Sequence, residues 1–314
     1  MPQAQLAVVI PVYNRETLVL ETLDSVRRQD VQPDLVVIID DGSTDCSHTN
    51  VEHWIQSHKL DPARWRLVHQ VNKGLSSARN AARPFVSNMD LIVFLDSDDI
   101  WPEDFVRRAK NHFQANPDDI AASSDGVKLF YDEQGSITHR KLLPLEPNPQ
   151  SFRLLRNRSP LVCATVFKLS ALDSIGWFDV RIRYGEDHLL WHLIATQGSW
   201  GYLPGKPFQY RYFHNPQQPH ASTAPQLTSR LRCARVLSKR LNELCDQNQL
   251  RNPDVRWAIW KTWYAAARAC DKAGKKAAAR RLYWEAIKAD PRQIKAAAHY
   301  LRCCVQKLLF TWGK

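Results

Sequence analysis

The sequence predicts an α/β fold built on a parallel sheet, followed by an all-helical extension at its C-terminal end. Short apolar runs alternate with helix-compatible stretches in the first part of the chain, and basic residues are concentrated in the last part. The chain has 314 residues, of which 44% are hydrophobic and 24% are charged. This is the composition of an ordinary globular protein, long enough for one large domain or two smaller ones.

Four short runs rich in Val, Ile and Leu are typical of strands that are covered on both faces. They span residues 6–10, 35–39, 65–69 and 91–95. The stretches between them, 16–29, 45–58 and 76–83, are compatible with helices. The alternation therefore predicts parallel strands joined by crossover helices. No G-x-G-x-x-G motif follows the first run, so we expect no dinucleotide site of the usual kind.

After Trp101 the order of elements changes. We expect a helix at 104–116, a hairpin formed by 120–131 and 136–143, a strand at 161–168 and a short helix at 171–175. A helix at 187–197 and a strand at 208–213 complete this part. From Pro225 onward the sequence is almost entirely compatible with helices.

The net charge of +11 is unevenly distributed along the chain. Residues 1–224 hold 23 Lys and Arg against 26 Asp and Glu, whereas residues 225–314 hold 20 against 6. This change predicts a boundary near Pro225. A basic C-terminal part indicates either an anionic neighbour, which can be a membrane surface, a nucleic acid or an acidic partner, or simply a solvated helical surface.

Cysteine usage and hydropathy favour a cytosolic protein. The seven cysteines are scattered and match neither a common metal spacing nor a disulfide framework. We recognise no signal peptide and no apolar stretch long enough to span a membrane.

The unusual polar residues follow the ends of the predicted strands. In an open α/β sheet, ligands bind beyond the carboxyl ends of the strands. The segments that reach this edge are PVYNR after the first strand, DDGSTD after the second, NKGLSSARN after the third and DSDD after the fourth. The sequence therefore predicts a polar ligand site at this edge.

Asp96 and Asp98 are candidate metal ligands. In an extended segment, residues i and i+2 point to the same face, with Cβ atoms about 6–7 Å apart. Carboxylate oxygens suit Mg²⁺ or Mn²⁺, and such an ion would neutralise the clustered charge. The alternative is a loop whose aspartates cap the next helix, a role that fits Asp99.

Two further segments have a possible binding role. Gly42 allows a tight turn and residues 43–45 suit a helix start, which leaves Asp40 free to accept a hydrogen bond from a ligand. The alternative is a plain strand–turn–helix junction. Arg79 near a helix start, with Lys73 upstream, favours phosphate, although two surface cations would look the same.

Five segments resemble the family 2 glycosyltransferases of the GT-A fold in order and spacing: VVIPVYNR, VVIIDDGSTD, NKGLSSARNAA, LIVFLDSDDIW and IGWFDVRIRYGEDHLLWHLI. The resemblance covers residues 5–214. It implies a GT-A domain over 1–224, with a nucleotide-binding half at 1–101 and an acceptor-binding half at 102–224, and a basic helical extension at 225–314. The family transfers a sugar from a nucleotide-diphosphate sugar to a hydroxyl, with inversion.

The resemblance also implies roles for individual residues. The donor nucleotide would be contacted by Pro11, Tyr13, Asn14, Arg15, Asp40, Lys73, Gly74, Arg79 and Asp96, with Asp40 accepting from the base. Asp98 would be the leading metal ligand. His214 falls near a position where some members place a histidine, but one extra residue intervenes.

On the acceptor side, the resemblance implies that Asp187 is the general base and Glu186 its neighbour. Acids at a helix N-terminus also stabilise the helix dipole, which is the alternative for this pair. Trp177 would belong to the acceptor wall or to the core. One base suffices for an inverting transfer, because the metal and nearby cations stabilise the leaving diphosphate.

We therefore expect a metal-dependent enzyme using Mn²⁺ or Mg²⁺, a UDP-sugar as donor, and a saccharide or lipid-linked acceptor, as in cell-surface polysaccharide or lipopolysaccharide synthesis. The expected location is cytoplasmic, with peripheral attachment to the anionic inner face of the membrane through the basic helices. No nucleic-acid partner is expected. The alternatives are a non-catalytic carbohydrate-binding or scaffold protein on the same fold and a nucleotidyltransferase.

Overall fold

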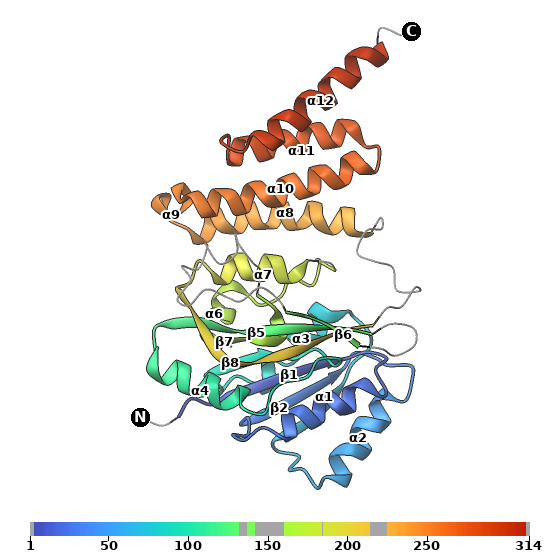
Figure 1. Ribbon diagram of the computed structural model, residues 1–314, viewed down its shortest axis with the longest axis vertical. Coiled ribbons are helices and arrows are strands. Elements are labelled where there is room, and N and C mark those ends of the chain that lie inside the picture. The colour runs from blue at the N-terminus through green and yellow to red at the C-terminus, as the bar shows by residue number, and fades with distance from the viewer. Residues whose placement is uncertain (1–2, 132–136, 142–159, 184, 214–224, 312–314) are drawn as a thin grey trace.

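The computed structural model describes residues 3–131, 137–141, 160–183, 185–213 and 225–311. In this part of the chain, one mixed sheet of eight strands carries helices on both faces, and the C-terminal helices are stacked beyond one of these faces (Figure 1). The predicted α/β class with a helical extension is confirmed.

The first part of the sheet is parallel, with the order β3-β2-β1-β4. Its elements are β1 (Leu6–Val12), α1 (Leu18–Arg27), β2 (Leu35–Asp40), α2 (Ser47–Ser57), β3 (Trp65–His69), α3 (Leu75–Ala81) and β4 (Leu91–Phe94). Each apolar run predicted as a strand forms one, and β1, β2 and β4 are buried on both faces, whereas β3 is only partly buried.

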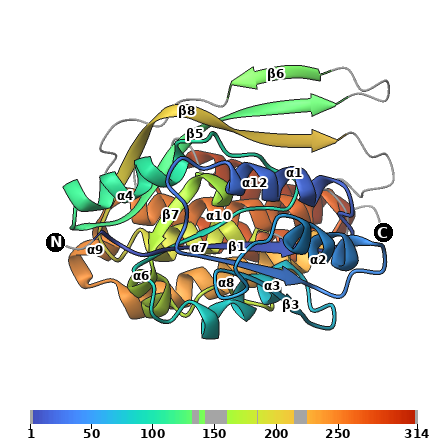
Figure 2. The same ribbon diagram turned by 90° about the horizontal axis from the view of Figure 1, so that it is seen from below.

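The sheet continues with strands from the second part of the chain. The elements are α4 (Phe105–Ala115), β5 (Asp119–Tyr131), β6 (Ile137–Lys141), β7 (Thr165–Lys168), α6 (Leu169–Ile175), α7 (Glu186–Ile194) and β8 (Ser199–Phe213). β7 pairs antiparallel with β4 and with β5, and β6 pairs antiparallel with the second half of β5 (Figure 2). The predicted hairpin is confirmed, although its turn lies outside the described residues.

Two strand boundaries differ from the prediction. Residues 162–164 form a 3₁₀ turn, so β7 begins only at Thr165. β8 begins at Ser199 and pairs with β5 along most of its length, with a register shift that skips residues 204–207. Pro204 and Pro207 cannot donate to the ladder, and they hide the continuity of this strand in the sequence pattern.

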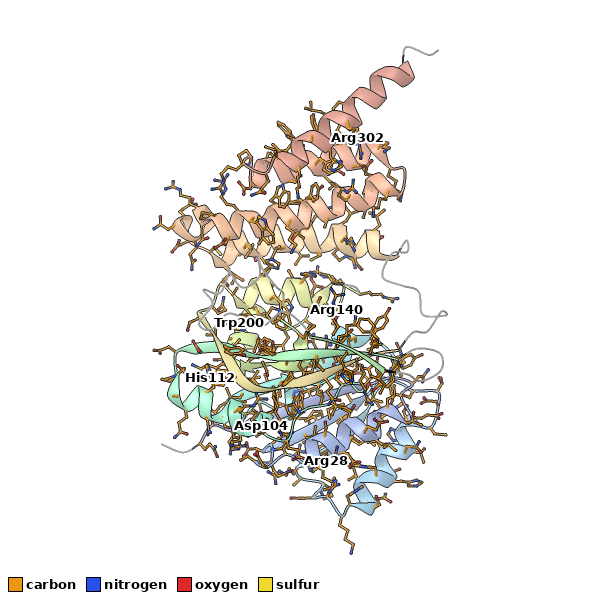
Figure 3. The ribbon with its side chains drawn as sticks, viewed as in Figure 1. Arg28, Asp104, His112, Arg140, Trp200 and Arg302 are labelled. Atoms are coloured by element: carbon orange, nitrogen blue, oxygen red, sulfur yellow. The ribbon has the colours of Figure 1, made fainter. Side chains whose placement is uncertain are left out.

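Alternate side chains of the strands build two separate apolar layers. Val8, Ile10 and Val93 pack with α1, α2 and α4, whereas Val9 and Phe94 pack with α3, α6, α7 and part of α8 (Pro225–Leu244). Trp200, labelled in Figure 3, is buried in the second layer, where its ring lies 5.7 Å from that of Trp191.

The extension consists of α8 (Pro225–Leu244), α9 (Gln247–Arg251), α10 (Pro253–Lys272), α11 (Lys276–Ala289) and α12 (Ile294–Thr311). Successive helices lie farther from the sheet, and α8 contacts α7 (Figure 1). Arg302 of α12, labelled in Figure 3, donates to Asp271 of α10 at 2.6 Å. Among the described helices, none combines the length and the apolar character that a membrane crossing requires.

His192 on α7 makes folding sensitive to acid. Burial lowers the pKa of His192 to about 4, while an unfolded histidine titrates near 6.5. Because the unfolded chain binds the proton more readily, stability falls as pH drops from about 6.5 towards 4, by up to ~3 kcal/mol. Urea unfolding at several pH values should show a flatter acid slope for His192→Phe than for the wild type. The exposed-site control His53→Gln should keep the wild-type slope, and equal slopes for all three proteins would refute this assignment.

Candidate functional site

A cleft of about 680 Å³ lies at the carboxyl ends of the first four strands. It is lined by Pro11, Val12, Tyr13, Asn14, Arg15, Asp41, Asn72, Gly74, Leu75, Ala78, Asp96, Ser97, Asp98, Tyr210 and Arg211. The edge of the sheet at which the sequence places a ligand site therefore does carry a cleft, and β8 contributes one wall of it.

The segment after β1 is fixed by hydrogen bonds to the segment after β2. Asn14 has a left-handed backbone (φ +52°), and its side-chain oxygen accepts from the Thr44 N–H at 2.8 Å. The Arg15 N–H donates to the Ser47 hydroxyl at 2.7 Å. Tyr13 lines the cleft and is 46% exposed, so its ring is accessible to a bound ligand.

Asp41 is a cleft residue that the sequence analysis missed. Its carboxylate accepts from the backbone N–H groups of Lys73 and Gly74, at 2.9 and 2.8 Å, and thereby holds the segment after β3 in place. A Cβ atom on Gly42 would lie 2.7 Å from the Asn72 nitrogen, which explains the glycine at this close approach. The described residues that line the cleft include Gly74 but not Lys73, whose side chain is exposed.

Asp40 does not have the free carboxylate that we expected. It is buried, and its carboxylate accepts from the Ser43 N–H at 3.0 Å and contacts Nδ1 of His48 and of His69 at 3.1 and 2.9 Å. Burial raises the pKa of Asp40, but the hydrogen bonds from Ser43 and His69 outweigh it, and the pKa falls below its usual value. The described residues lining the cleft include Asp41 but not Asp40.

Asp96 and Asp98 both line the cleft, as predicted. Burial and the charge of Asp96 raise the pKa of Asp98, and Nε of Arg15 lies 3.4 Å from Oδ2 of Asp98. The site therefore concentrates acidic groups that a divalent ion would stabilise. Carboxylate oxygens are ligands that suit Mg²⁺ or Mn²⁺.

The turn that carries these carboxylates is held by Arg211 of β8, which the sequence analysis also missed. Its Nε donates to the carbonyl oxygen of Asp98, its backbone N–H donates to Asp99 at 3.0 Å, and its Nη1 pairs with Glu21 at 2.5 Å. Asp99 is thus bound to β8. It does not cap α4, whose N-cap residue is Asp104.

Arg79 is buried, and the described cleft lining does not include it. Its Nη2 pairs with Asp96 at 2.7 Å, its Nη1 pairs with Glu186 at 3.3 Å, and its guanidinium lies 5.0 Å from the Phe178 ring centroid. The expected contact with diphosphate is therefore replaced by an ion-pair bridge. This bridge joins the carboxylate segment after β4 to the start of α7.

Removing the Arg79 bridge should be costly. In Arg79→Met, two carboxylates lose a buried partner, and we expect a loss of about 3–5 kcal/mol in the free energy of unfolding. The matched control is Arg83→Met, because Arg83 is 57% exposed and pairs with Asp173 at the surface. The control should cost less than about 1 kcal/mol. Chemical denaturation measures both values, and equal losses would contradict the bridging role.

Asp187 stands in the first turn of α7, which begins after Gly185, a residue with a left-handed backbone (φ +76°). Its Oδ1 accepts from the His188 N–H at 2.7 Å. Its neighbour Glu186 is largely buried, and that burial raises the pKa of Glu186. Asp187 is therefore connected to the cleft through Glu186, Arg79 and Asp96.

Of the remaining predicted site residues, Trp177 is described by the structure, and it does not line the cleft. Trp177 is buried in the core, where its ring lies 6.0 Å from that of Phe94 and its N–H donates to Asp173 at 2.9 Å. It packs in the apolar layer, so of the two alternatives stated for Trp177, acceptor wall or core, the structure supports the core. His214 lies outside the described residues.

The fold is the GT-A fold of solved glycosyltransferases. Staphylococcus aureus TarS (residues 1–349) in complex with UDP-GlcNAc has a TM-score of 0.71 and 17% identity, over 95% of this chain and 89% of that one. The mannosyltransferase PcManGT from Pyrobaculum calidifontis, with GDP-Man and Mn²⁺, has a TM-score of 0.54 and 20% identity, over 98% and 88%.

The model of "Glycosyl transferase family 2" matches residues 7–172, more than half of the chain. The chain belongs to this family. An uncharacterized glycosyltransferase of Rickettsia felis is 31% identical over 202 residues, 63% of this chain and 31% of its own length. The minor teichoic acid biosynthesis protein GgaB of Bacillus subtilis is 26% identical over 65% of this chain and 23% of its own length. The chain thus spans about a third or less of these relatives.

Proposed function

We propose that this chain is a metal-dependent, inverting glycosyltransferase that transfers a sugar from a UDP-sugar to a hydroxyl of a saccharide or glycolipid. The observation that carries the proposal is the cleft at the carboxyl ends of β1 to β4, in which Tyr13, Asp41 and Asp98 lie together. Its position is the one at which open α/β sheets bind ligands.

The donor class is supported by the shape and lining of this cleft. Pro11, Tyr13 and Asn14 line the cleft and contribute an accessible aromatic ring, and Gly74, at the start of α3, lines it as well. TarS has been solved with UDP and with UDP-GlcNAc, whereas PcManGT has been solved with GDP-Man. We choose the UDP class because TarS has the higher TM-score of the two.

The division of chemical roles follows from the charges. A divalent ion, held by Asp98 with support from Asp96, would neutralise charge that develops on the leaving diphosphate. Arg15 can swing from Asp98 towards a phosphate, since the two side chains remain 30% and 26% exposed. Asp187 would accept the proton of the attacking hydroxyl, and the Arg79–Glu186 bridge would fix the start of α7 relative to Asp96.

For the acceptor we propose a chemical class, a lipid-linked saccharide, and for the enzyme a cytoplasmic location at a membrane surface. A cytoplasmic enzyme that glycosylates a lipid-linked saccharide would benefit from attachment to an anionic membrane surface. The described part of α12 exposes Ile294 and Leu301 beside Lys295 and Arg302, which suits a shallow interfacial contact.

Thermal-shift measurements with a panel of nucleotides and nucleotide sugars, each with Mn²⁺, with Mg²⁺ and with neither, test the proposal. We expect stabilisation by UDP and by one UDP-sugar, dependent on the ion. Ligand at about 100 times its Kd stabilises by ~2.7 kcal/mol, which is readily detected. Stabilisation by a guanosine or thymidine nucleotide instead would overturn the donor class, and no stabilisation by any nucleotide would overturn the proposal.

A further inference from the structure

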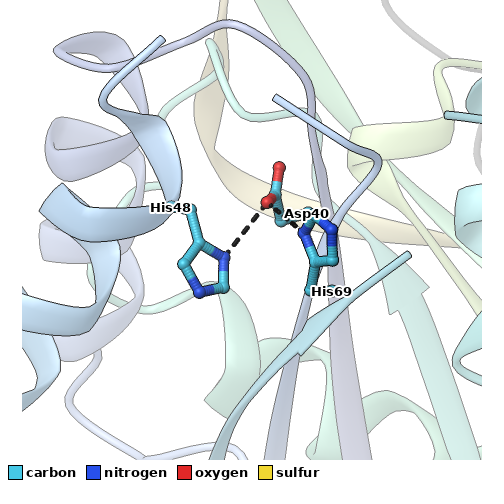
Figure 4. A group of neighbouring side chains, drawn as sticks. All are labelled: Asp40, His48 and His69. Carbon is cyan, nitrogen blue, oxygen red and sulfur yellow. Dashed lines mark hydrogen bonds and ion pairs between the residues drawn. The ribbon is translucent and has the colours of Figure 1, made fainter. Parts of the chain in front are cut away.

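A second group of potential metal ligands lies behind the cleft, separate from Asp98. It consists of Asp40 at the end of β2, His48 in the first turn of α2 and His69 at the end of β3. Figure 4 shows both imidazole rings directed at one oxygen of the Asp40 carboxylate. Three consecutive elements of the chain thus converge on a single point.

The geometry points to a zinc site. Tetrahedral Zn²⁺ has bonds of about 2.0–2.1 Å to nitrogen and oxygen, which separates neighbouring ligand atoms by about 3.3 Å. The two Nδ1 atoms lie 2.9 and 3.1 Å from Oδ2 of Asp40, and the three candidate ligand atoms all lie within 4.8 Å of one another. Both Nδ1–Oδ2 separations are a few tenths of an ångström shorter than the tetrahedral separation, and rotation of the partly exposed histidine side chains would admit the ion.

The surroundings of the three residues support this assignment. Oδ1 of Asp40 accepts from the Ser43 N–H at 3.0 Å, and this hydrogen bond orients the carboxylate as an outer-shell partner orients a metal ligand. The side chains of His48 and His69 are 40% and 56% exposed, so an ion can enter and a water can complete its coordination. Two imidazoles and one carboxylate suit Zn²⁺ better than Mg²⁺, which prefers oxygen ligands.

We propose that Asp40, His48 and His69 bind a Zn²⁺ ion that ties β2, α2 and β3 together behind the cleft. This proposal is independent of the proposed function, because it needs neither a nucleotide nor the ion at Asp98. It does assign Asp40 to the zinc site and not to the nucleobase. The adjacent Asp41, which holds the segment after β3, would be stiffened by the ion.

The test is titration of the full-length, metal-stripped protein with Zn²⁺ alone, followed by calorimetry and by thermal unfolding. A parallel titration with Co²⁺ uses visible absorption, whose intensity reports tetrahedral coordination. We expect one site in the wild type and a higher melting temperature with Zn²⁺. His48→Gln and His69→Gln should each weaken this binding by about 100-fold or more, since even outer-shell changes cost about 10–100-fold. Both histidines are partly exposed, so these variants should fold.

Two controls separate this site from other zinc binding. His53→Gln changes an exposed histidine of the same helix α2 and should bind as the wild type does. Asp98→Asn should also keep the site, which distinguishes it from the proposed donor metal. Retention of full affinity in the double variant His48→Gln/His69→Gln would overturn the proposal, as would an equal loss in His53→Gln. A failure of the nucleotide panel would leave this result unaffected.

Discussion

Asp187→Asn should retain donor binding and lose transfer. We expect the rate of sugar transfer to fall by ~10²–10⁴, the usual contribution of a general base, while metal-dependent stabilisation by UDP stays at the wild-type level. The asparagine side chain keeps the shape of the aspartate and an oxygen that can accept from the His188 N–H at the start of α7. The variant should therefore fold normally and lack only a group that can take up a proton.

The measurement is steady-state transfer, with donor binding followed separately by thermal shift. Asp179→Asn is a suitable control, because Asp179 pairs with the neighbouring exposed Arg181 and its loss should leave transfer near the wild-type rate. If Asp187→Asn lost donor binding together with transfer, Asp187 would be part of the donor site. A normal rate in the variant would remove it from catalysis altogether.

Asp98→Asn should abolish the ion dependence of donor binding. Burial and the charge of Asp96 raise the pKa of Asp98, which means that its ionised form is disfavoured in the folded protein without ligand. When the pKa of a carboxyl group is higher in the folded than in the unfolded state, folding stability decreases as the pH rises from the unfolded-state pKa towards the folded-state pKa. The unliganded variant should therefore be at least as stable as the wild type at neutral pH, and it should gain no stability from UDP with Mn²⁺.

The two results together, undiminished stability without ligand and no stabilisation by UDP with Mn²⁺, distinguish a ligand-binding carboxylate from a structural one. Asp90→Asn is a matched control, because Asp90 directly precedes the N-terminal end of β4, away from the cleft. Its carboxylate accepts from the Gln5 N–H at 2.8 Å. The control should keep the stabilisation by UDP with Mn²⁺. A variant at Asp98 that is strongly destabilised without ligand, or that still responds to the ion, would contradict the assignment.

The sequence predicted the strands well because they are nearly continuous apolar runs between polar ends. β1, β2 and β4 are buried on both faces, so no partner on either side has to be known in advance. β8 was predicted too short, since the skipped residues 204–207 depend on the register with β5. The register depends on the sequences of both paired strands, so the sequence of β8 alone does not indicate it.

The site could be located from the sequence, but several roles within it could not. The adjacent aspartates 40 and 41 look equivalent in the sequence, yet one faces two histidines and the other faces the cleft. Arg79 pairs with Glu186, which is 107 positions away in the sequence, and Arg211 pairs with Glu21, which is 190 positions away. These pairings arise from the tertiary fold, and no local spacing indicates them.

Diffraction from crystals grown with Mn²⁺ and a UDP-sugar, recorded near the manganese absorption edge, tests the donor site most directly. We predict one strong anomalous peak within about 2.0–2.3 Å of a carboxylate oxygen of Asp98, with the diphosphate beside it and the base near Tyr13. An anomalous peak away from Asp98, or a nucleotide bound outside the cleft, would contradict the proposed mechanism.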